Sequence, residues 1–341
     1  MKLGQLLNCA VIVVTATTFT LPLTGCAKAG KSENATSESV QEQERKGGKG
    51  GGPQLGQPGG GPAIDKSGDA VLQSMIKDIV PRFRQFEFTD SVTGKTLKYN
   101  LFTPENVKAG KSYPLVLFMA DASTPGEQYT TPLTQGYGAL VWATSAWQAE
   151  NPCYVLVPQF SGVAVNDDYE HTDEVDMVVR LVKKIAAENN VDTKRLYTTG
   201  QSMGGMISMY YNITYPDLFA ASLFVDCHWD TSKFDELAKH KFVYVTAGNG
   251  GHSWGDIAPL EEAAKADGIK YEYEQWSAKL PQSEQDSLAS AMLAKGATVN
   301  IINFTPKSVL PADGKGSEHM YSFDYAYKLT PVLKWIFRQS R

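Results

Sequence analysis

One short stretch, residues 195–211, constrains the possible fold more than any other part of the sequence. A strand-like apolar run at 195–199 leads directly into Gly200-Gln201-Ser202-Met203-Gly204-Gly205, and a helix-like run follows. This G-x-S-x-G spacing is typical of a sharp strand-to-helix turn that holds its serine in a strained conformation. A Cβ at either flanking glycine would collide with neighbouring backbone, and the helix would direct its free N–H groups towards the serine. The stretch therefore predicts Ser202 as a nucleophile at the end of a buried strand.

Strand-like and helix-like runs alternate along the rest of residues 70–341, which is the pattern of an α/β sheet. The runs 85–89 and 97–102 flank a turn at 91–94 and predict an opening antiparallel hairpin. Further strands are expected at 114–119, 154–158, 195–199, 221–225, 242–246 and 299–304. Helices are expected at 172–189, 206–211, 259–266, 283–295 and 323–338. The sequence thus predicts one α/β domain, a mostly parallel, doubly wound sheet with helices on both faces.

The first 69 residues differ in composition from this domain. Residues 1–25 carry a positive charge at Lys2 and continue into a short apolar run, as in a signal peptide. They end in Leu23-Thr24-Gly25-Cys26, which resembles a bacterial lipobox with Cys26 as the lipidated residue. An ordinary secretion signal with an incidental Cys26 is the alternative. Residues 26–69 are rich in Ser, Glu and Lys and then in Gly and Pro, so we expect a disordered tether. The predicted location is the outer face of a bacterial cell membrane.

Charge and cysteine usage exclude several classes of partner. The net charge is −5 and the domain has no long basic run, which argues against nucleic acid binding. Cys153 and Cys227 lie at opposite ends of expected parallel strands, too far apart for a disulfide, so both are predicted to be buried free thiols. No recognised metal-ligand spacing is present, and we expect neither a metal nor an organic cofactor.

A serine nucleophile requires a general base and usually an acid that orients it. The candidate bases are His171, His228, His240, His252 and His319. In a strand-turn-helix site of this kind the chain order is Ser, acid, His, which selects His319 after the last expected strand.

The acid is less well defined by the sequence. Asp256 is the first carboxylate after the strand at 242–246 and is our first choice, although it could instead cap a helix. Asp226, at the end of the preceding strand, is the second choice. Asp230, or no acid at all, remains open.

At these residues the chain resembles the predicted-peptidase and polyhydroxybutyrate-depolymerase-like esterase branch of the α/β hydrolases. The resemblance covers about residues 86–337 and is carried by short runs around the elbow. These runs are Thr103-Pro104-Glu105-Asn106, Tyr113-Pro114-Leu115-Val116-Leu117-Phe118, Val191-Asp192-Thr193-Lys194-Arg195-Leu196-Tyr197 and Tyr215-Pro216-Asp217-Leu218-Phe219. The resemblance implies an α/β-hydrolase fold and an oxyanion hole formed by the Met203 N–H and a backbone N–H near Ala122.

Two departures from that family pattern bear on the chemistry. The family usually has His-Gly after its first long parallel strand, where this chain has Ala120-Asp121. A carboxylate at Asp121 would oppose a developing oxyanion unless its side chain turns away. The family's acid would align near Gly251, where this chain has no carboxylate.

The expected reaction is acyl transfer through an acyl-enzyme. Ser202 would attack an ester carbonyl, His319 would take and return the proton, and water would release the acid. The resemblance implies a small ester or a carbohydrate-linked acyl substrate. A serine peptidase of the same fold is the enzymatic alternative. A catalytically degraded hydrolase, acting as a surface-tethered binding lipoprotein, is the alternative from another class.

Overall fold

The computed structural model describes residues 54–60, 64–105 and 107–341. These residues belong to one compact unit that spans 51–341. The predicted signal peptide and Cys26 lie outside the described residues. Within the described ranges, no helix combines the length and the apolar character that a membrane crossing requires.

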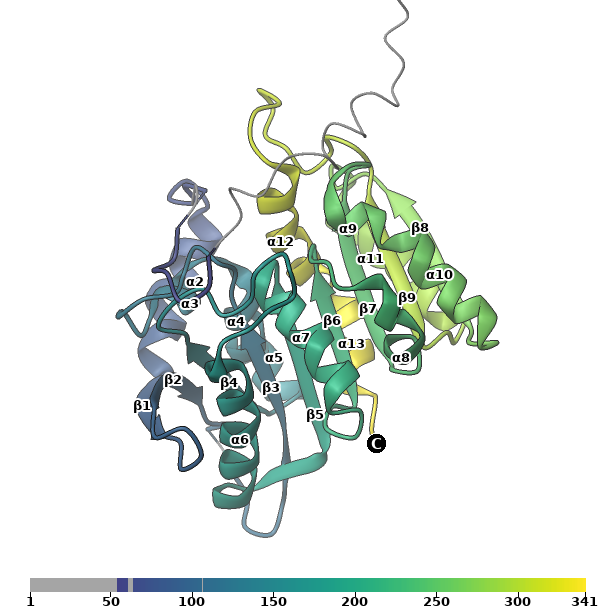
Figure 1. Cartoon of the computed structure of the whole chain (residues 1–341). Coiled ribbons are helices and arrows are strands. Elements are labelled where there is room, and N and C mark those ends of the chain that lie inside the picture. The colour runs from purple at the N-terminus through teal and green to yellow at the C-terminus, as the bar shows by residue number, and fades with distance from the viewer. Residues whose placement is uncertain (1–53, 61–63, 106) are drawn as a thin grey trace, which may run out of the picture. The chain divides into compact units, whose positions relative to one another are not determined.

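A nine-stranded sheet forms the centre of this unit (Figure 1). The strands are β1 (Arg84–Thr89), β2 (Thr96–Phe102), β3 (Tyr113–Met119), β4 (Tyr154–Gln159), β5 (Val191–Gln201), β6 (Ala221–Val225), β7 (Phe242–Ala247), β8 (Tyr271–Trp276) and β9 (Val299–Phe304). Their order is β1-β2-β4-β3-β5-β6-β7-β9-β8. The β1–β2 and β2–β4 pairs are antiparallel, and all other pairs are parallel. The central strand, β5, ends at Gln201, beside the candidate nucleophile.

Two layers of helices cover the sheet. One face packs against α6 (Asp173–Glu188), α7 (Met203–Thr214), α8 (Phe234–Leu237) and α10 (Ile257–Ala266). The other packs against α2 (Ala70–Ile79), α4 (Tyr137–Leu140), α5 (Ser145–Glu150), α11 (Gln282–Ala294), α12 (Glu318–Lys328) and α13 (Thr330–Phe337). Successive residues of β3 alternate between the two cores, because neighbouring side chains of a strand point to opposite faces. Both faces of the sheet are therefore buried, as expected for parallel strands.

All the predicted strands are present, within a few residues of their expected bounds, and β8 is an addition. Its sequence alternates Tyr and Glu, and most of its side chains remain partly exposed at the sheet edge. It therefore lacks the apolar run by which buried strands are recognised.

The single helix expected at 323–338 is wrong. The chain leaves the helical conformation at Leu329, where ψ is 82°, and α13 starts with Pro331 in its first turn. Proline fits the first turn of a helix but not its interior. The preceding helix, α12, begins at Glu318, five residues before the expected start, so His319 lies in its first turn.

The described part of the expected tether is bound to the domain. The Gly56 N–H donates to Val163 O at 2.9 Å, and the Val163 N–H donates to Gln57 O at 2.8 Å. Gly59 and Gly60 donate to Pro125 O and Ala122 O at 2.9 and 3.2 Å. Our expectation of a disordered tether as far as residue 69 is therefore wrong for residues 54–60 and 64–69. Backbone hydrogen bonds, which composition does not reveal, hold this glycine-rich segment in place.

Cys153 and Cys227 are buried free thiols, as predicted. Burial raises the pKa of the Cys153 thiol to about 12. It also raises the pKa of Cys227 well above the usual range. Neither side chain is therefore a nucleophile near neutral pH.

Candidate active site

Ser202 lies in the predicted turn between β5 and α7. Its backbone is strained, with φ 50° and ψ −121°, and its N–H donates to Val225 O at 3.0 Å. A Cβ on Gly200 would lie 2.2 Å from the carbonyl carbon of Gly204. A Cβ on Gly204 would lie 2.0 Å from Met119 O. The collisions predicted for the two flanking glycines are thus confirmed, and the close approach of α7 to β3 and β5 is their cause.

His319 is the histidine that the fold brings to Ser202. Its Nε2 lies 2.9 Å from Ser202 Oγ. Its ring also stands edge-on to Phe323, with centroids 5.1 Å apart, so the imidazole is held from the side. Burial lowers the pKa of His319, but the hydrogen bond and charge of Asp226 more than offset this, and the pKa is raised. A partly buried imidazole with a nearby carboxylate is suited to take a proton from the serine.

Asp226 stands behind His319. Its Oδ1 lies 3.5 Å from His319 Nδ1, and its side chain is 1% exposed. Asp226 directly follows β6 and has a φ of 41°, a conformation that residues other than glycine rarely adopt. Ser253 Oγ donates to Asp226 Oδ1, and Ser322 Oγ donates to Asp226 Oδ2 at 2.7 Å. Two hydroxyls therefore fix this buried carboxylate against the imidazole.

Asp256, our first choice for the acid, lies elsewhere. Its Oδ2 accepts a hydrogen bond from the Trp229 N–H at 3.0 Å. Burial raises the pKa of Asp256 to about 7, although the Trp229 N–H and His228 oppose that shift. A carboxyl group that is partly protonated near neutral pH stabilises an imidazolium poorly. The choice of Asp256 is therefore corrected to Asp226, because the fold places the end of β6, and not the start of α10, beside His319.

The remaining candidates do not reach the nucleophile. Asp230 caps a short turn by accepting from the Ser232 N–H at 3.0 Å. His228 pairs with Asp167 at 3.3 Å and stacks on His252, with ring centroids 4.5 Å apart. Within the described part of the chain, His319 is the histidine at hydrogen-bond distance from Ser202 Oγ.

The expected oxyanion hole combines the start of α7 with the loop after β3. Met203 is the first residue of α7, where N–H groups have no acceptor within the helix. Ala122 lies in the loop that follows β3, and its carbonyl accepts from the Gly60 N–H of the N-terminal segment. Two backbone donors at such positions could stabilise a negative oxygen near Ser202.

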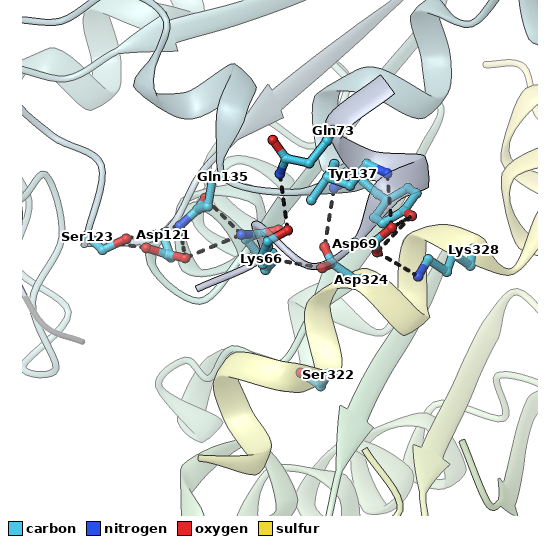
Figure 2. A network of polar contacts seen from close by, with 12 residues as sticks. Lys66, Asp69, Gln73, Asp121, Ser123, Gln135, Tyr137, Ser322, Asp324 and Lys328 are labelled. Carbon is cyan, nitrogen blue, oxygen red and sulfur yellow. Dashed lines mark hydrogen bonds and ion pairs between the residues drawn. The ribbon is translucent and has the colours of Figure 1, made fainter. Parts of the chain in front are cut away.

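The Asp121 carboxylate lies in a hydrogen-bond network with Ser123 and Gln135 (Figure 2). Its Oδ1 accepts from the Ser123 N–H at 2.8 Å, while its Oδ2 accepts from Gln135 and, at 3.3 Å, from Gln201. The carboxylate is 2% exposed and faces two side-chain amides. The unfavourable effect of Asp121 on an oxyanion is thereby reduced, because its charge is already hydrogen-bonded on both oxygens.

Residues 64–79 are attached to the helix that carries His319 (Figure 2). Lys66 Nζ lies 2.7 Å from Asp324 Oδ2, and Asp324 Oδ1 accepts from the Tyr137 N–H at 3.2 Å. Asp69 accepts from the Tyr137 hydroxyl at 3.0 Å and pairs with Lys328 at 3.7 Å. These contacts join the N-terminal segment, α4 and α12, and so help to fix the position of the helix that carries His319.

Sequence reasoning missed several groups of this site. Ser253 and Ser322 are unremarkable serines in the sequence, and Gln135 lies in a segment without a recognisable motif. Ser322 follows His319 by three residues, which places both on one face of a helix. If α12 is known to start at Glu318, that spacing predicts that Ser322 lies near His319.

Comparison with known proteins agrees with this geometry. The family model "Esterase: Putative esterase" matches residues 91–288, more than half of the chain. The chain belongs to the Esterase family. The match begins in the turn of the opening hairpin and ends in α11, so it includes Ser202 and Asp226, whereas His319 lies beyond it.

Solved structures show that this chain has the α/β-hydrolase fold. A thermostable esterase is 24% identical with a TM-score of 0.59, over 77% of this chain and 64% of its own. The chain thus spans less than two thirds of that structure. The S954A mutant of the feruloyl esterase module from Clostridium thermocellum, complexed with sinapinate, is 13% identical with a TM-score of 0.53. That match covers 84% of this chain and 96% of the module. No curated protein matches the chain.

Proposed function

We propose that this esterase hydrolyses carboxylic esters through an acyl-enzyme on Ser202. The observation that carries the proposal is the continuous line of contacts from Ser202 Oγ through His319 to Asp226, with distances of 2.9 and 3.5 Å. The residues that directly follow β5 and β6 meet a residue of α12 there, although the three are far apart in the sequence. A nucleophile, a base and a buried carboxylate in this arrangement are the parts that acyl transfer requires.

The chemistry follows from the positions of these groups. His319 Nε2 takes the Ser202 proton while Oγ attacks the ester carbonyl, and Asp226 stabilises the imidazolium that forms. The carbonyl oxygen becomes negative and is stabilised by the Met203 and Ala122 N–H groups. The imidazolium then gives its proton to the departing alcohol, and water cleaves the acyl-enzyme by the same route.

Two finer parts of the proposal concern the substrate and the location. The feruloyl esterase module that shares the fold is complexed with sinapinate. This favours an acyl group esterified to carbohydrate as the substrate of the present chain. We also propose that the protein is lipid-anchored at Cys26 and lies outside the cytoplasm, on the strength of Leu23-Thr24-Gly25-Cys26.

The alternative of a degraded hydrolase that acts as a binding lipoprotein rested on two departures from the family pattern. The missing carboxylate near Gly251 is replaced by Asp226, which lies on a different strand end. Both carboxylate oxygens of Asp121 accept hydrogen bonds, from the Ser123 N–H and from Gln135. Neither departure therefore supports loss of activity. A serine peptidase would use the same three residues, so assays with peptide and ester substrates distinguish the two activities.

A fluorophosphonate probe tests the proposal on the full chain. We expect covalent labelling of the wild type, no labelling of Ser202→Ala and much slower labelling of His319→Ala. Ser287→Ala, an exposed serine on α11, is the matched control and should label like the wild type. The wild type should also hydrolyse 4-nitrophenyl esters. A folded wild type that neither labels nor hydrolyses any ester would overturn the proposed function and restore the binding lipoprotein.

Gly59→Ala should slow the reaction without touching the triad. A Cβ at Gly59 would lie 2.7 Å from Ser123 O and 2.8 Å from Pro125 O, so the N-terminal segment must lift from the loop that carries Ala122. We expect kcat to fall about 10- to 100-fold, because small displacements of catalytic donors are costly. Gly60→Ala is the matched control, since the atom nearest to its Cβ is Pro58 O at 3.9 Å. A Gly59→Ala protein with the same kcat as Gly60→Ala and the wild type would show that the N-terminal segment does not position the loop carrying Ala122.

A further inference from the structure

The turn that follows β3 is closed by hydrogen bonds among its own residues. The Thr124 N–H donates to Asp121 O at 3.2 Å, which defines a β-turn over residues 121–124. Asp121 Oδ1 accepts from the Ser123 N–H at 2.8 Å, a bond that aspartate commonly forms at the first position of a turn. The buried Thr124 hydroxyl donates to the same Asp121 O at 3.0 Å. The Asp121 carbonyl therefore has two donors, which fix its direction.

This carbonyl belongs to the same peptide unit as the Ala122 N–H, which is an expected donor of the oxyanion hole. The C=O and N–H of a planar trans peptide point in opposite directions. Because Thr124 binds the carbonyl on one side, the Ala122 N–H faces the other side. Within the described part of the chain this N–H has no hydrogen-bond acceptor, and Ala122 is partly exposed. It is therefore available to a ligand.

A buried glutamine at the end of each neighbouring strand holds the turn. Gln159 is the last residue of β4, and its Nε2 donates to Thr124 O at 3.0 Å. Gln201 is the last residue of β5, and its Nε2 donates to Asp121 Oδ2 at 3.3 Å. The two glutamines are 3% and 1% exposed. Since β4 and β5 flank β3 in the sheet, the turn is anchored on both sides.

The chain that enters this turn also touches the start of α7. A Cβ at Gly204 would lie 2.0 Å from Met119 O and 2.8 Å from Ala120 O. The two residues that lead towards Ala122 therefore lie directly beside the helix that begins with Met203. The two expected oxyanion donors thus come from segments that are in contact.

Resting on the proposed ester hydrolysis, we propose that Thr124 and Gln159 are positioning residues of the oxyanion hole. The Thr124 hydroxyl orients the Asp121–Ala122 peptide so that its N–H faces the negative oxygen that develops beside Ser202. Gln159 holds Thr124 in place from β4. Two donors on the carbonyl also polarise the peptide, which strengthens its N–H as a donor. Both residues act through this peptide, and neither contacts the substrate.

Thr124→Val in the full chain tests the proposal, because it removes the hydroxyl and keeps the shape of the side chain. We expect kcat for a 4-nitrophenyl ester to fall about tenfold while KM changes less than about twofold. Formation and hydrolysis of the acyl-enzyme both pass through a negative oxygen that the bound ester lacks. Thr124→Ser keeps the hydroxyl and should restore kcat to within about threefold of the wild type.

Two further readouts distinguish an oxyanion effect from a change in the triad. A trifluoromethyl ketone forms a negative oxygen when Ser202 adds to it, so its inhibition constant should rise in Thr124→Val by about the factor by which kcat falls. The acidic limb of the pH–rate profile should stay at the same pH, because that limb reports the protonation of His319. A shifted limb with an unchanged inhibition constant would overturn the proposal.

Thr246→Val controls for the loss of a buried hydroxyl as such. Thr246 is fully buried in β7, and its hydroxyl donates to Asn303 Oδ1 at 2.8 Å. Thermal unfolding compares the stability of the two valine variants. We expect kcat of Thr246→Val to stay within about twofold of the wild type, whatever its loss of stability. An equal fall of kcat in both variants would overturn the positioning role.

Gln159→Met tests the second positioning residue, because methionine has about the same length but no donor. We expect kcat to fall severalfold at an unchanged KM. Adding Thr124→Val should then cost less than it does in the wild type, since both side chains act through one peptide. Losses that multiply in the double variant would show that Gln159 does not act through Thr124.

These measurements also separate the inference from the proposed function. Ester hydrolysis by the wild type with the same kcat in Thr124→Val would overturn the positioning role and leave the proposed function intact. A folded wild type that hydrolyses no ester would overturn the proposed function and the positioning role with it.

Discussion

Replacing Asp226 by asparagine should lower kcat for an ester substrate by about 10³- to 10⁴-fold, whereas Asp256→Asn should change it by less than about threefold. Asp226 Oδ1 lies 3.5 Å from His319 Nδ1, and Ser322 Oγ donates to its other oxygen. An amide in this position neither balances the imidazolium charge nor preserves the hydrogen-bond pattern that orients the ring. Asp256 instead accepts from the Trp229 N–H.

The two asparagine variants form a matched pair, because each removes one buried carboxylate, Asp226 directly after β6 and Asp256 directly after α9 (Gly251–Gly255). Steady-state kinetics with a 4-nitrophenyl ester measure kcat, and circular dichroism confirms that both variants are folded. A large loss of kcat in Asp256→Asn together with an active Asp226→Asn would show that Asp256, and not Asp226, is the acid. Loss of the raised His319 pKa in Asp226→Asn, seen as a shift of the acidic limb of the pH–rate profile to lower pH, is a second readout.

Gly204→Ala should destabilise the fold by about 3 kcal/mol or more and abolish most activity. An added Cβ would lie 2.0 Å from Met119 O and 2.4 Å from the Met119 carbonyl carbon. These are main-chain atoms of the last residue of β3, so neither can rotate aside as a flexible side chain would. The start of α7 must move away from the sheet, and Ser202 and the Met203 N–H move with it.

Urea unfolding followed by tryptophan fluorescence measures this loss of stability. Gly255→Ala is the matched control, because a Cβ added at Gly255 meets no heavy atom within 4 Å. That residue ends α9, and we expect its substitution to change the free energy of unfolding by less than about 1 kcal/mol. A Gly204→Ala protein as stable as the control would show that α7 does not approach β3 as closely as described.

The sequence predicted most of the fold because buried parallel strands are short apolar runs. The six runs at 114–119, 154–158, 195–199, 221–225, 242–246 and 299–304 all became strands of the sheet. The strand β8 escaped detection, because an edge strand with alternating Tyr and Glu leaves most of its side chains partly exposed. The boundary of α12 was missed for a local reason, the break at Leu329 before Pro331.

Chain order was sufficient to select the base but not the acid. Ser202 is defined by local backbone constraints, since a Cβ added at Gly200 or Gly204 would lie 2.0–2.2 Å from main-chain atoms. Such constraints leave a recognisable motif in the sequence. His319 is defined by following the last strand of the expected topology. Asp226 and Asp256 both follow strands at the same edge of the sheet, so sequence position does not distinguish them.

The sequence by itself predicted the candidate nucleophile, its candidate base, the α/β fold and the free thiols, because each depends on local spacing or on strand order. The tertiary structure decided which carboxylate contacts His319 and which groups donate to the Asp121 carboxylate. It also decided that the segment 54–60 binds the loop carrying Ala122. These features depend on contacts between segments separated by tens of residues or more. Such contacts are set by how helices and loops pack over the sheet, and no local pattern in the sequence encodes them.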